Sequence, residues 1–456
     1  MAVWSCVEID NLSEDFRLDA EHYQPEYLRQ EKAMAKLPHV ELRTVADVSD
    51  GNHMSIAEDF AEKGVRYLRG QDLSDFFISD ADPIYIPERT YTGLSRSHMF
   101  PGDVLVGIVG TIGSVGLVTN RHGKLTGNCK LAIIRTRSLP AEYIATYLAS
   151  RVGQNEIQRR VRGAVQMGLI LPDIKALPIV VPNDTQRDAI VNLVKGAERN
   201  RELCRELVAQ AENLVAESLG LLNLDLSESL FYERDFADFQ TANRFGAEYF
   251  MPCKQRVLDA LAKQPGRLLS EHCQSVRDLF DATDARRGEQ VRNFDLTAAL
   301  EPVLDDSMET MPAAEIGSTK KKFQAGDVVI SRLRSYLREI AVVRTSPAVA
   351  AIGSSEFIVL RPRENAKSKL TPETLLIYLR SLPVQTILKW SQDGSAHPRF
   401  DEDDLLAIPV PDSVVRIAPK IDALVNEALT ARAEAARLLE EAKAEVERLV
   451  LKTSPA

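Results

Sequence analysis

The sequence lacks the features of a disulfide-rich, zinc-binding or membrane-spanning protein. Its 456 residues include only five cysteines and no CxxC pair, which excludes a disulfide framework and a zinc ribbon. The longest apolar stretch, residues 104–118, is shorter than the ~20 residues of a membrane span and contains four glycines, so it predicts a β-hairpin. The acidic N-terminus lacks the pattern of a signal peptide, and we expect a cytoplasmic protein.

An excess of positive charge is also missing. The 56 Lys and Arg residues are outnumbered by 66 Asp and Glu, and the net charge of -10 excludes a uniformly basic nucleic-acid coat. Any nucleic-acid contact must therefore come from local patches. No HExxH, GxSxG or P-loop motif is present, and no glycine motif for S-adenosylmethionine. The acidic run 401–404 fits a solvated turn or a helix start better than a metal site.

What the chain does contain is a second copy of its own pattern. The offset between matching residues is 227 near the start of each half, 224 to 226 in the middle and 231 from residue 142 onward. A period of this length is too long for a solenoid unit and indicates a duplicated module with pseudo-twofold symmetry. The matched pairs include Arg17 with Arg244, Pro25 with Pro252, Gly102 with Gly326, Arg135 with Arg361, Tyr147 with Tyr378, Gly163 with Gly394 and Pro178 with Pro409.

Each half divides into a mixed region with short β runs, a proline-bounded exit and a long helical pattern. The helical patterns cover residues 184–221 and 418–452, where apolar and small residues recur in steps of three and four as in a heptad seam. Packing on its own domain would explain one such helix, but two at matching positions favour an antiparallel coiled coil. We therefore predict an α+β fold with two pseudo-twofold-related β-rich domains, each followed by a long helix. The predicted boundaries are 1–182, 183–222, 223–411 and 412–456.

Two matching turns in the β-rich regions hold the other candidate chemistry, and the second has the most DNA-like local composition in the chain. Residues 109–114 (VGTIGS) match neither a P-loop nor a Rossmann fingerprint, so a hairpin turn is the better interpretation. Their counterpart, residues 331–338, has three arginines and a tyrosine in place of the glycines, and arginine suits guanine edges and phosphates. Lysines occupy 320–322, and a looser basic cluster covers 121–137. For each patch alone, a solvated charged face is the ordinary alternative.

Short motifs follow one another in a fixed order along the chain. They are RYLRGQDL at 66–73, YIPE at 85–88, GDVL at 102–105, GTIG at 110–113 and LPIVVP at 177–182, with GDVV at 326–329 and IPVP at 408–411 in the second half. The second half lacks the Gly-Thr-Ile-Gly turn, and its counterpart of the first strand motif is poor. This ordered set resembles the specificity subunits of type I restriction-modification systems, over nearly the whole chain.

The resemblance implies a non-catalytic DNA reader. Each β-rich target-recognition domain would bind one half of a split, asymmetric DNA sequence, with half-sites about one helical turn (~34–36 Å) apart. The antiparallel helices would set the spacing and dock two methyltransferase subunits, which restriction subunits then join. Base flipping for adenine methylation would fall to the partner. S-adenosylmethionine, ATP and Mg are accordingly expected in the partner subunits, and no cofactor in this chain.

Particular residues are expected at each surface. Those expected at DNA are Arg69, Gln71, Asn128 and Lys130 in the first domain and Lys322, Arg332, Arg334, Tyr336 and Arg338 in the second. Those expected to support partner docking are Ile190, Leu193, Leu207, Leu214, Ile421, Leu424, Leu438 and Leu449. Two other classes remain open. One is a DNA-processing enzyme with unrecognised catalytic residues, and the other is a coiled-coil scaffold that does not bind DNA, which the net charge favours.

Overall fold

The computed structural model divides into two compact units. Unit 1 contains Met1–Asn200 and Ala433–Ala456, and unit 2 contains Arg201–Arg432. Among the described residues, no helix is both long and apolar enough to cross a membrane. The residues that the structure describes are 4–9, 12, 17–73, 76–163, 165–242, 244–281, 283, 288–363 and 370–451.

Unit 1 is built on three sheets. Its strands are β1 (His39–Glu41), β2 (Ala46–Asp50), β3 (Val65–Leu68), β4 (Phe76–Phe77), β5 (Ile84–Ile86), β6 (His98–Met99), β7 (Asp103–Gly107), β8 (Val115–Leu117), β9 (Leu125–Gly127), β10 (Leu131–Thr136) and β11 (Pro178–Val180). Its shorter helices are α1 (Pro25–Met34), α2 (Leu42–Val45), α3 (Glu88–Gly93), α4 (Ala141–Ala149), α5 (Arg151–Gln158) and α6 (Leu171–Lys175). The sheet orders are β2-β10-β7-β8-β4, β5-β3-β9-β6 and β1-β11. Helix α4 packs on the first of these sheets, and α5 packs against α4.

Unit 2 repeats this plan. Its strands are β12 (Gly266–Leu268), β13 (Cys273–Val276), β14 (Leu279–Phe280), β15 (Gln290–Phe294), β16 (Val303–Asp305), β17 (Met311–Pro312), β18 (Lys320–Phe323), β19 (Val328–Ser331), β20 (Ile340–Arg344), β21 (Ala350–Gly353), β22 (Phe357–Pro362) and β23 (Pro409–Pro411). Its shorter helices are α8 (Phe236–Ala242), α9 (Pro252–Ala262), α10 (Leu269–His272), α11 (Pro372–Arg380), α12 (Leu382–Lys389) and α13 (Glu402–Leu406). The sheet orders are β13-β22-β19-β20-β16, β14-β18-β21-β15-β17 and β12-β23.

The predicted hairpin is confirmed in unit 1 and has a counterpart in unit 2. Strands β7 and β8 pair antiparallel, with Val106 opposite Val115, so the apolar stretch forms core strands joined by a turn. Strands β19 and β20 pair in the same way, with Ile330 opposite Ile340. The central residues of these strands are buried because both faces of the sheets are covered.

The duplication is also confirmed at the proline-bounded exits. The Tyr147 hydroxyl on α4 donates a hydrogen bond to the Pro178 carbonyl oxygen at 2.9 Å. The equivalent Tyr378 on α11 donates to the carbonyl oxygen of Pro409. Both tyrosines are buried, so each exit strand is tied to its domain by a hydroxyl inside an apolar core.

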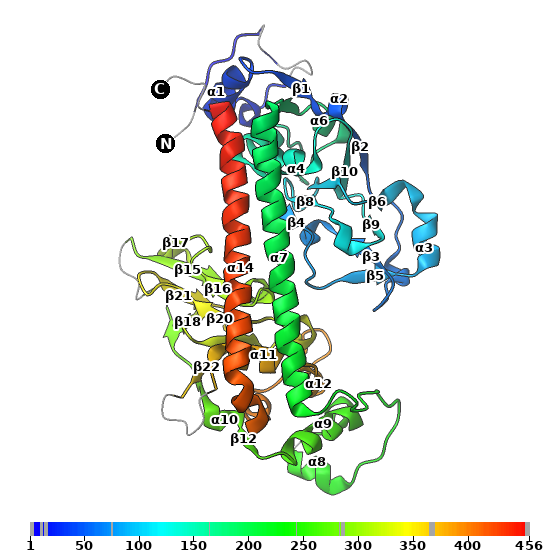
Figure 1. Cartoon of the computed structure of the whole chain (residues 1–456), viewed down its shortest axis with the longest axis vertical. Helices are drawn as coiled ribbons and strands as arrows, with labels where there is room; N and C mark the ends of the chain where they lie inside the picture. Colours follow the sequence, from blue (N-terminus) through cyan, green and yellow to red (C-terminus); the bar gives the residue numbers. More distant parts are fainter. Residues whose placement is uncertain are drawn as a thin grey trace. The chain divides into compact units, whose positions relative to one another are not determined.

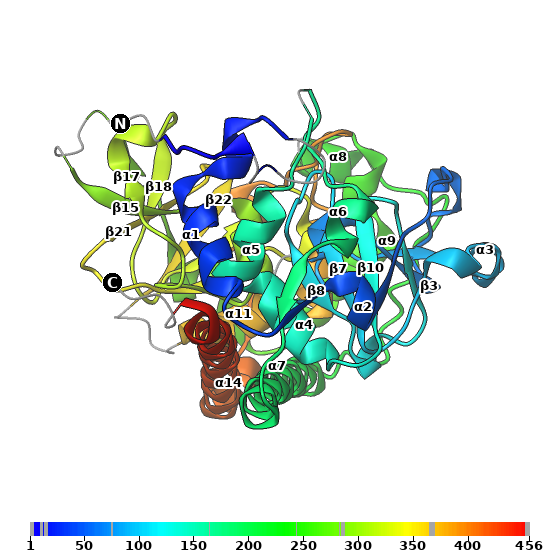
Figure 2. The ribbon, with the colours of Figure 1, turned by 90° about the horizontal axis from the view of Figure 1, so that it is seen from above.

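The two long helices are α7 (Asp184–Leu219) and α14 (Asp412–Leu451). In unit 1 the N-terminal half of α7 shares a core with the C-terminal half of α14, as Ala197 and Ala442 do (Figures 1 and 2). In unit 2 the C-terminal half of α7 shares a core with the N-terminal half of α14, as Val215 and Val425 do. Opposite halves meet in both units, which confirms an antiparallel pair.

The predicted helix ends need correction. Helix α14 begins at Asp412 and includes Pro419, whereas the sequence pattern starts it at residue 418. Pro419 is the eighth residue of this helix, where its ring removes one backbone hydrogen bond. Packing of the apolar face of the helix compensates for this loss. Helix α7 ends at Leu219, two residues before the expected end, because Gly220 adopts a left-handed φ of 64°. Residue 452 lies outside the described part of the chain.

The residues buried at the interface of the two long helices also differ from those that the heptad pattern predicts. Ile190, Leu207 and Ile421 are buried as the heptad pattern requires. Leu193, Leu214, Leu424, Leu438 and Leu449 are only half-buried, and the neighbour that follows each of them in the sequence is buried instead. Two adjacent apolar residues are compatible with two registers, so the pattern alone does not choose between them. The buried neighbours are Val194, Val215, Val425, Leu439 and Val450.

Candidate nucleic-acid interface

The residues expected at DNA in unit 1 come together at one sheet edge. Strands β3 and β9 run parallel, with Leu68 opposite Gly127, so the segments that follow them leave the sheet at the same edge. Arg69 and Gln71 follow β3, and Asn128 and Lys130 follow β9. The Asn128 backbone N–H donates to the Leu68 carbonyl oxygen at 3.1 Å. Two motifs about 60 residues apart thus form one edge.

The hairpin turn of residues 108–114 completes this edge. The Ile108 backbone N–H donates to the Lys130 carbonyl oxygen at 2.9 Å. A Cβ atom at Gly70 would lie 2.4 Å from Thr111 Oγ1, so only glycine permits this contact. The segment at Leu169 joins the turn through its backbone N–H, which donates to the Ile108 carbonyl oxygen at 2.9 Å. The turn, the loop after β9 and the segment at Leu169 thus form a three-segment edge connected by backbone hydrogen bonds, beside the loop after β3.

The side chains of this edge differ in exposure and in partners. The Arg69 guanidinium lies 3.1 Å from Asp72 Oδ1 and 3.2 Å from Asp82 Oδ2, and the Arg69 side chain is only 19% exposed. Asn128 is half-buried, and its Oδ1 accepts from the Lys130 backbone N–H at 3.2 Å. Gln71 and Lys130 are exposed. Arg69 and Asn128 thus hold the loops in shape, while Gln71 and Lys130 extend toward solvent.

Unit 2 forms the same edge with different side chains. The Arg332 backbone N–H donates to the Glu356 carbonyl oxygen at 3.0 Å, as Ile108 does to Lys130 in unit 1. The Phe400 backbone N–H donates to the Arg332 carbonyl oxygen at 3.2 Å, as Leu169 does to Ile108. The turn 331–338 is therefore the structural counterpart of the glycine-rich turn, as its sequence position predicts.

A carboxylate holds two arginines at this second edge. Arg399 Nη2 lies 2.8 Å from Glu356 Oε1, and Arg332 Nε lies 3.6 Å from Glu356 Oε2. The hydrogen bond from Arg399 is the main reason that the pKa of Glu356 is lowered. No sequence motif identifies Arg399. The only signal for it is its position in the repeat, because Arg399 comes five residues after Gly394, as Gly168 comes five residues after the matching Gly163.

The arginine-rich turn has an unusual backbone. Arg334 and Arg338 adopt φ angles of 49° and 52°. Residues other than glycine seldom adopt this left-handed conformation. They flank the 3-10 helix Ser335–Leu337, in which the Tyr336 side chain is 59% exposed. The Arg334 backbone N–H donates to the Pro398 carbonyl oxygen at 3.0 Å. Strain of this kind, about 1–3 kcal/mol for each residue, is typical of functional loops.

Lys322 lies on β18, outside the turn. Its side chain is exposed, and its Nζ lies 5.9 Å from the centre of the Phe280 ring. The neighbouring Lys321 lies close enough to Arg332 to be affected by its charge. Burial is the main cause of the lowered pKa of Lys321, and Arg332 adds to it. Because successive side chains alternate along a strand, Lys321 belongs with the arginine-rich turn and Lys322 with the opposite face.

The structure locates the strand motif that is hard to recognise in the second half. Strand β15 pairs parallel with β21 just as β3 pairs with β9, so β15 is the counterpart of β3. Arg292 on β15 then corresponds to Arg66 on β3, and Asp295 takes the place of Arg69. The first residue after this strand is therefore acidic in unit 2 and basic in unit 1.

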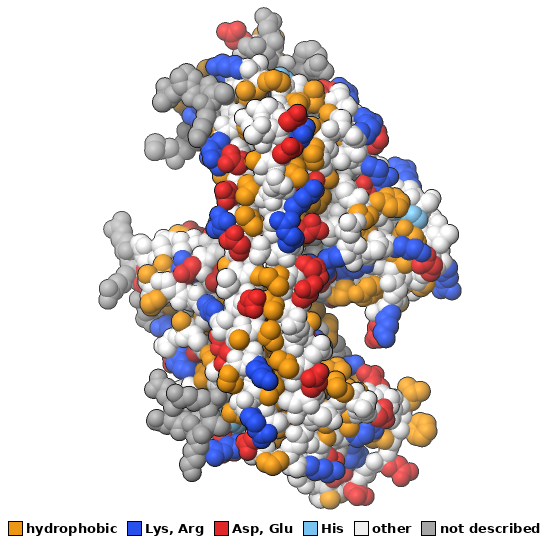
Figure 3. All heavy atoms as spheres, viewed as in Figure 1, with side chains coloured by type: hydrophobic (Ala, Val, Ile, Leu, Met, Phe, Trp, Pro, Cys, Tyr) orange, Lys and Arg blue, Asp and Glu red, His pale blue; other side chains and the backbone are white. Residues whose placement is uncertain are grey.

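No group of three His, Cys, Asp or Glu residues that could hold a metal ion occurs among the described residues. The acidic run does start a helix, because Asp401 is the residue before α13, and Arg244 pairs with both Asp401 and Asp404. On the face in Figure 3, the acidic and basic side chains that are drawn in colour are interspersed.

Comparison with known proteins finds likeness in structure and none in sequence. No protein-family profile matches the chain, and no curated protein matches it. The chain is similar to the solved S subunit of a type I restriction-modification system from M. genitalium, with 16% identity and a TM-score of 0.40 over 90% of this chain and 95% of that chain. It is similar to the HsdS subunit of Thermoanaerobacter tengcongensis, with 16% identity and a TM-score of 0.30 over 90% of this chain and 96% of that one. A third similar chain belongs to a study of assembly and conformational transition of the type I R-M system, with the same identity and TM-score over 90% and 98% of the two chains.

Proposed function

We propose that this chain is the DNA-reading specificity subunit of a type I restriction-modification system and is itself non-catalytic. The observation that carries the proposal is the three-segment edge, which occurs in both units with the same backbone hydrogen bonds and different side chains. A duplicated scaffold with two different reading edges suits a DNA site whose two halves differ. The domains 1–182 and 223–411 would read DNA, and the segments 183–222 and 412–456 would set the spacing.

The side chains at the two edges suit different chemical groups of DNA. Gln71 has the bidentate geometry for adenine, and Arg334 and Arg338 have it for guanine. Lys130 suits phosphate, which positions the protein without specifying sequence. Lys322 also suits phosphate, but it would contact DNA from outside the reading edge, on the face of β18 opposite to the turn. Arg69 and Arg332, with Asn128, support these loops through the partners they already bind, and Tyr336 offers an exposed ring for apolar contact. Each edge would read its own half-site.

The partners follow from the same proposal. Two methyltransferase subunits would dock on α7 and α14 and carry out base flipping and methylation with S-adenosylmethionine. Restriction subunits, which use ATP and Mg, would join that core. The half-buried Leu193, Leu214, Leu424, Leu438 and Leu449 would contact the docked subunits. Ile190, Leu207 and Ile421 are buried, so they would stabilise the packing of the helices and would not contact the docked subunits.

The test is DNA binding by the purified chain together with its methyltransferase subunit. Binding of a bipartite duplex at least 100-fold tighter than an unrelated duplex, with affinity that falls steeply as salt rises, supports the proposal. Assembly without DNA binding would instead identify an interaction scaffold. Cleavage or methylation by this chain alone would identify a DNA-processing enzyme.

A further inference from the structure

Three exposed apolar side chains recur at matching positions near the beginnings of the two domains. Trp4 is 79% exposed and the matching Phe231 is 91% exposed. Ile9 and Phe236 are 82% and 67% exposed. The third pair is Leu18, at 81%, and Phe245, at 75%. Each pair has the offset of 227 that relates the beginnings of the two halves. Single exposed apolar residues are common, but a repeated set of three large ones indicates an interaction surface.

In unit 1, two of these three residues line a groove. Its volume is about 580 Å³, and its walls include Trp4 and Leu18 together with Val7, Leu12 and Tyr23. A volume of this size is in the range that accommodates a few side chains of a binding partner. The groove is therefore a defined apolar site to which Trp4 and Leu18 contribute.

In unit 2 the matching positions form an aromatic cluster. The ring of Phe239 stacks on that of Phe245 at 5.9 Å between centres, and it lies 4.7 Å from that of Phe250. These three positions match Leu12, Leu18 and Tyr23, which line the groove of unit 1. Phe245 is exposed, and Phe239 and Phe250 are half-buried beside it. Aromatic side chains dominate the binding energy of many protein interfaces.

Acidic residues also recur beside these apolar side chains. Glu8 matches Asp235 and Glu21 matches Glu248, and all four side chains are exposed. A repeated apolar surface with a repeated acidic rim favours a partner segment that carries apolar side chains flanked by Lys or Arg. The constant offset favours one kind of partner bound twice.

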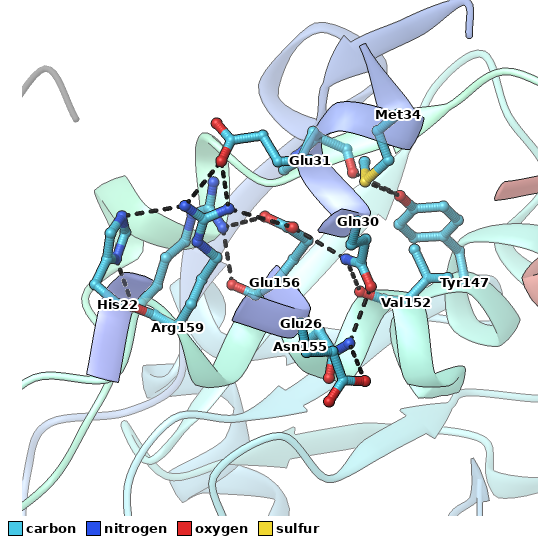
Figure 4. Close-up of polar contacts among 12 residues, drawn as sticks. His22, Glu26, Gln30, Glu31, Met34, Tyr147, Val152, Asn155, Glu156 and Arg159 are labelled. Atoms are coloured by element: carbon cyan, nitrogen blue, oxygen red, sulfur yellow. Dashed lines mark hydrogen bonds and ion pairs between the residues drawn. The ribbon is translucent and has the colours of Figure 1, made fainter. Parts of the chain in front are cut away.

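Hydrogen bonds hold both segments against the domains to which they belong. In unit 1, His22 Nδ1 lies 2.7 Å from the Arg159 carbonyl oxygen, and the Gln30 amide donates to the Val152 carbonyl oxygen at 2.9 Å (Figure 4). These contacts hold the 3-10 helix Ala20–Tyr23 and α1 against α5. In unit 2, the Tyr249 hydroxyl donates to Asp404 at 3.0 Å. The segments therefore present their apolar side chains from the surface of each domain.

We propose that the surfaces formed by residues 4–9, 12 and 17–23 and by residues 231–242 and 244–250 each bind one methyltransferase subunit, through a segment of that subunit with apolar side chains and a basic flank. This assignment rests on the proposed function and adds a second contact surface to the long helices. Two equivalent surfaces suit the partner that is expected in two copies, one beside each reading domain.

The experiment counts methyltransferase subunits bound to the full-length chain by native mass spectrometry of the co-purified complex. The wild type should bind two copies, each three-residue variant should bind one, and the combined variant should bind none. A control variant changes exposed apolar residues elsewhere in unit 2 and should bind two. The first variant is Trp4→Ser, Ile9→Ser and Leu18→Ser, the second is Phe231→Ser, Phe236→Ser and Phe245→Ser, and the control is Leu268→Ser and Leu279→Ser.

The outcomes separate this proposal from the proposed function. If the variants still bind two copies with unchanged affinity, the surfaces are not docking sites, although the specificity role stands. If the wild type binds no methyltransferase, both proposals fail. Self-association of the wild-type chain that the variants lose would assign the surfaces to a second copy of the chain and overturn this proposal. Should a serine variant fold poorly, the surface variants Asp235→Lys and Glu248→Lys should each weaken binding at least 10-fold, and unchanged binding would contradict the proposal.

Discussion

Asp327 accepts two hydrogen bonds from one guanidinium, with Oδ1 at 2.7 Å from Arg361 Nε and Oδ2 at 2.9 Å from Arg361 Nη2. Asp103 and Arg135 make the same pair in unit 1, at 2.9 and 2.7 Å. Both aspartates are buried and also accept a backbone N–H from the turn before them. The repeated Gly-Asp-Val motif is therefore explained by a buried carboxylate that joins a turn to the neighbouring strand.

Replacing this carboxylate should destabilise unit 2. Asp327→Asn keeps the shape of the side chain but leaves Arg361 without its ionic partner, and we expect a loss of about 2–3 kcal/mol. The matched control is Asp47→Asn, because Asp47 pairs with Arg137 at an exposed position and should cost less than about 1 kcal/mol. Thermal unfolding followed by circular dichroism measures both. Equal effects of the two changes would contradict the role assigned to Asp327.

Overpacking the helix seam should be costly where α14 is buried. Ala442 is fully buried, so Ala442→Leu should lower the stability of unit 1 by about 1–3 kcal/mol. Ala444 lies on the exposed side of the same helix, and Ala444→Leu should change stability by less than about 0.5 kcal/mol. Urea unfolding of the two variants makes the comparison. A tolerated leucine at residue 442 would show that the seam is not closely packed.

Lys254 should make stability depend on alkaline pH. Burial lowers its pKa to about 8 from an ordinary value of 10.5, and its ammonium lies 3.3 Å from the centre of the Tyr249 ring. Between these two pH values the folded chain holds fewer protons than the unfolded chain, so this lysine makes stability rise with pH. Below about pH 8 the lysine is charged in both states and its full burial penalty remains.

Lys254→Met should therefore raise stability at pH 7 and flatten the rise between pH 8 and 10. The exposed Lys420→Met serves as the control and should leave the pH profile unchanged. Melting temperatures at unit pH intervals provide the measurement. A profile that keeps its slope in the Lys254 variant would assign the pH dependence to other groups.

Arg334→Ala should relax sequence preference at one half-site. Loss of a bidentate contact to guanine costs about 1–3 kcal/mol, which corresponds to roughly 5- to 150-fold in affinity for the preferred base. Lys130→Ala, at the other reading edge, should weaken binding of all sequences to a similar extent because lysine contacts phosphate. Binding assays of the assembled complex on duplexes altered in one half at a time distinguish the two. Equal loss at both halves in Arg334→Ala would exclude a base-reading role.

Much of the fold could be predicted because its signals are local or repeated. The constant offset from residue 142 onward indicates the duplication, and the heptad patterns at residues 184–221 and 418–452 predict α7 and most of α14. The seam register could not be predicted, since pairs such as Leu424 and Val425 satisfy two heptad frames. Packing against the rest of each unit selects the valine.

The proposed reading edges could be predicted only in part. Charge within motifs makes Arg69 and Lys130 candidates for DNA contact, which stays a prediction, and the parallel pairing of β3 and β9 explains why their loops meet. The ion pairs that occupy Arg69 depend on Asp82, thirteen residues away in an irregular loop, which no periodic pattern encodes. Arg399 was missed because its contact with Glu356 joins residues far apart in the sequence.

The most direct test of the specificity role is a base-resolution methylation map of the source genome, recorded with and without this gene. The account predicts that methylation disappears at one bipartite motif when the gene is removed and returns when it is restored. The Arg334→Ala gene should restore methylation with a relaxed preference in one half of that motif. A map that is unchanged by removal of the gene, in a strain that expresses the methyltransferase subunit, would contradict the account.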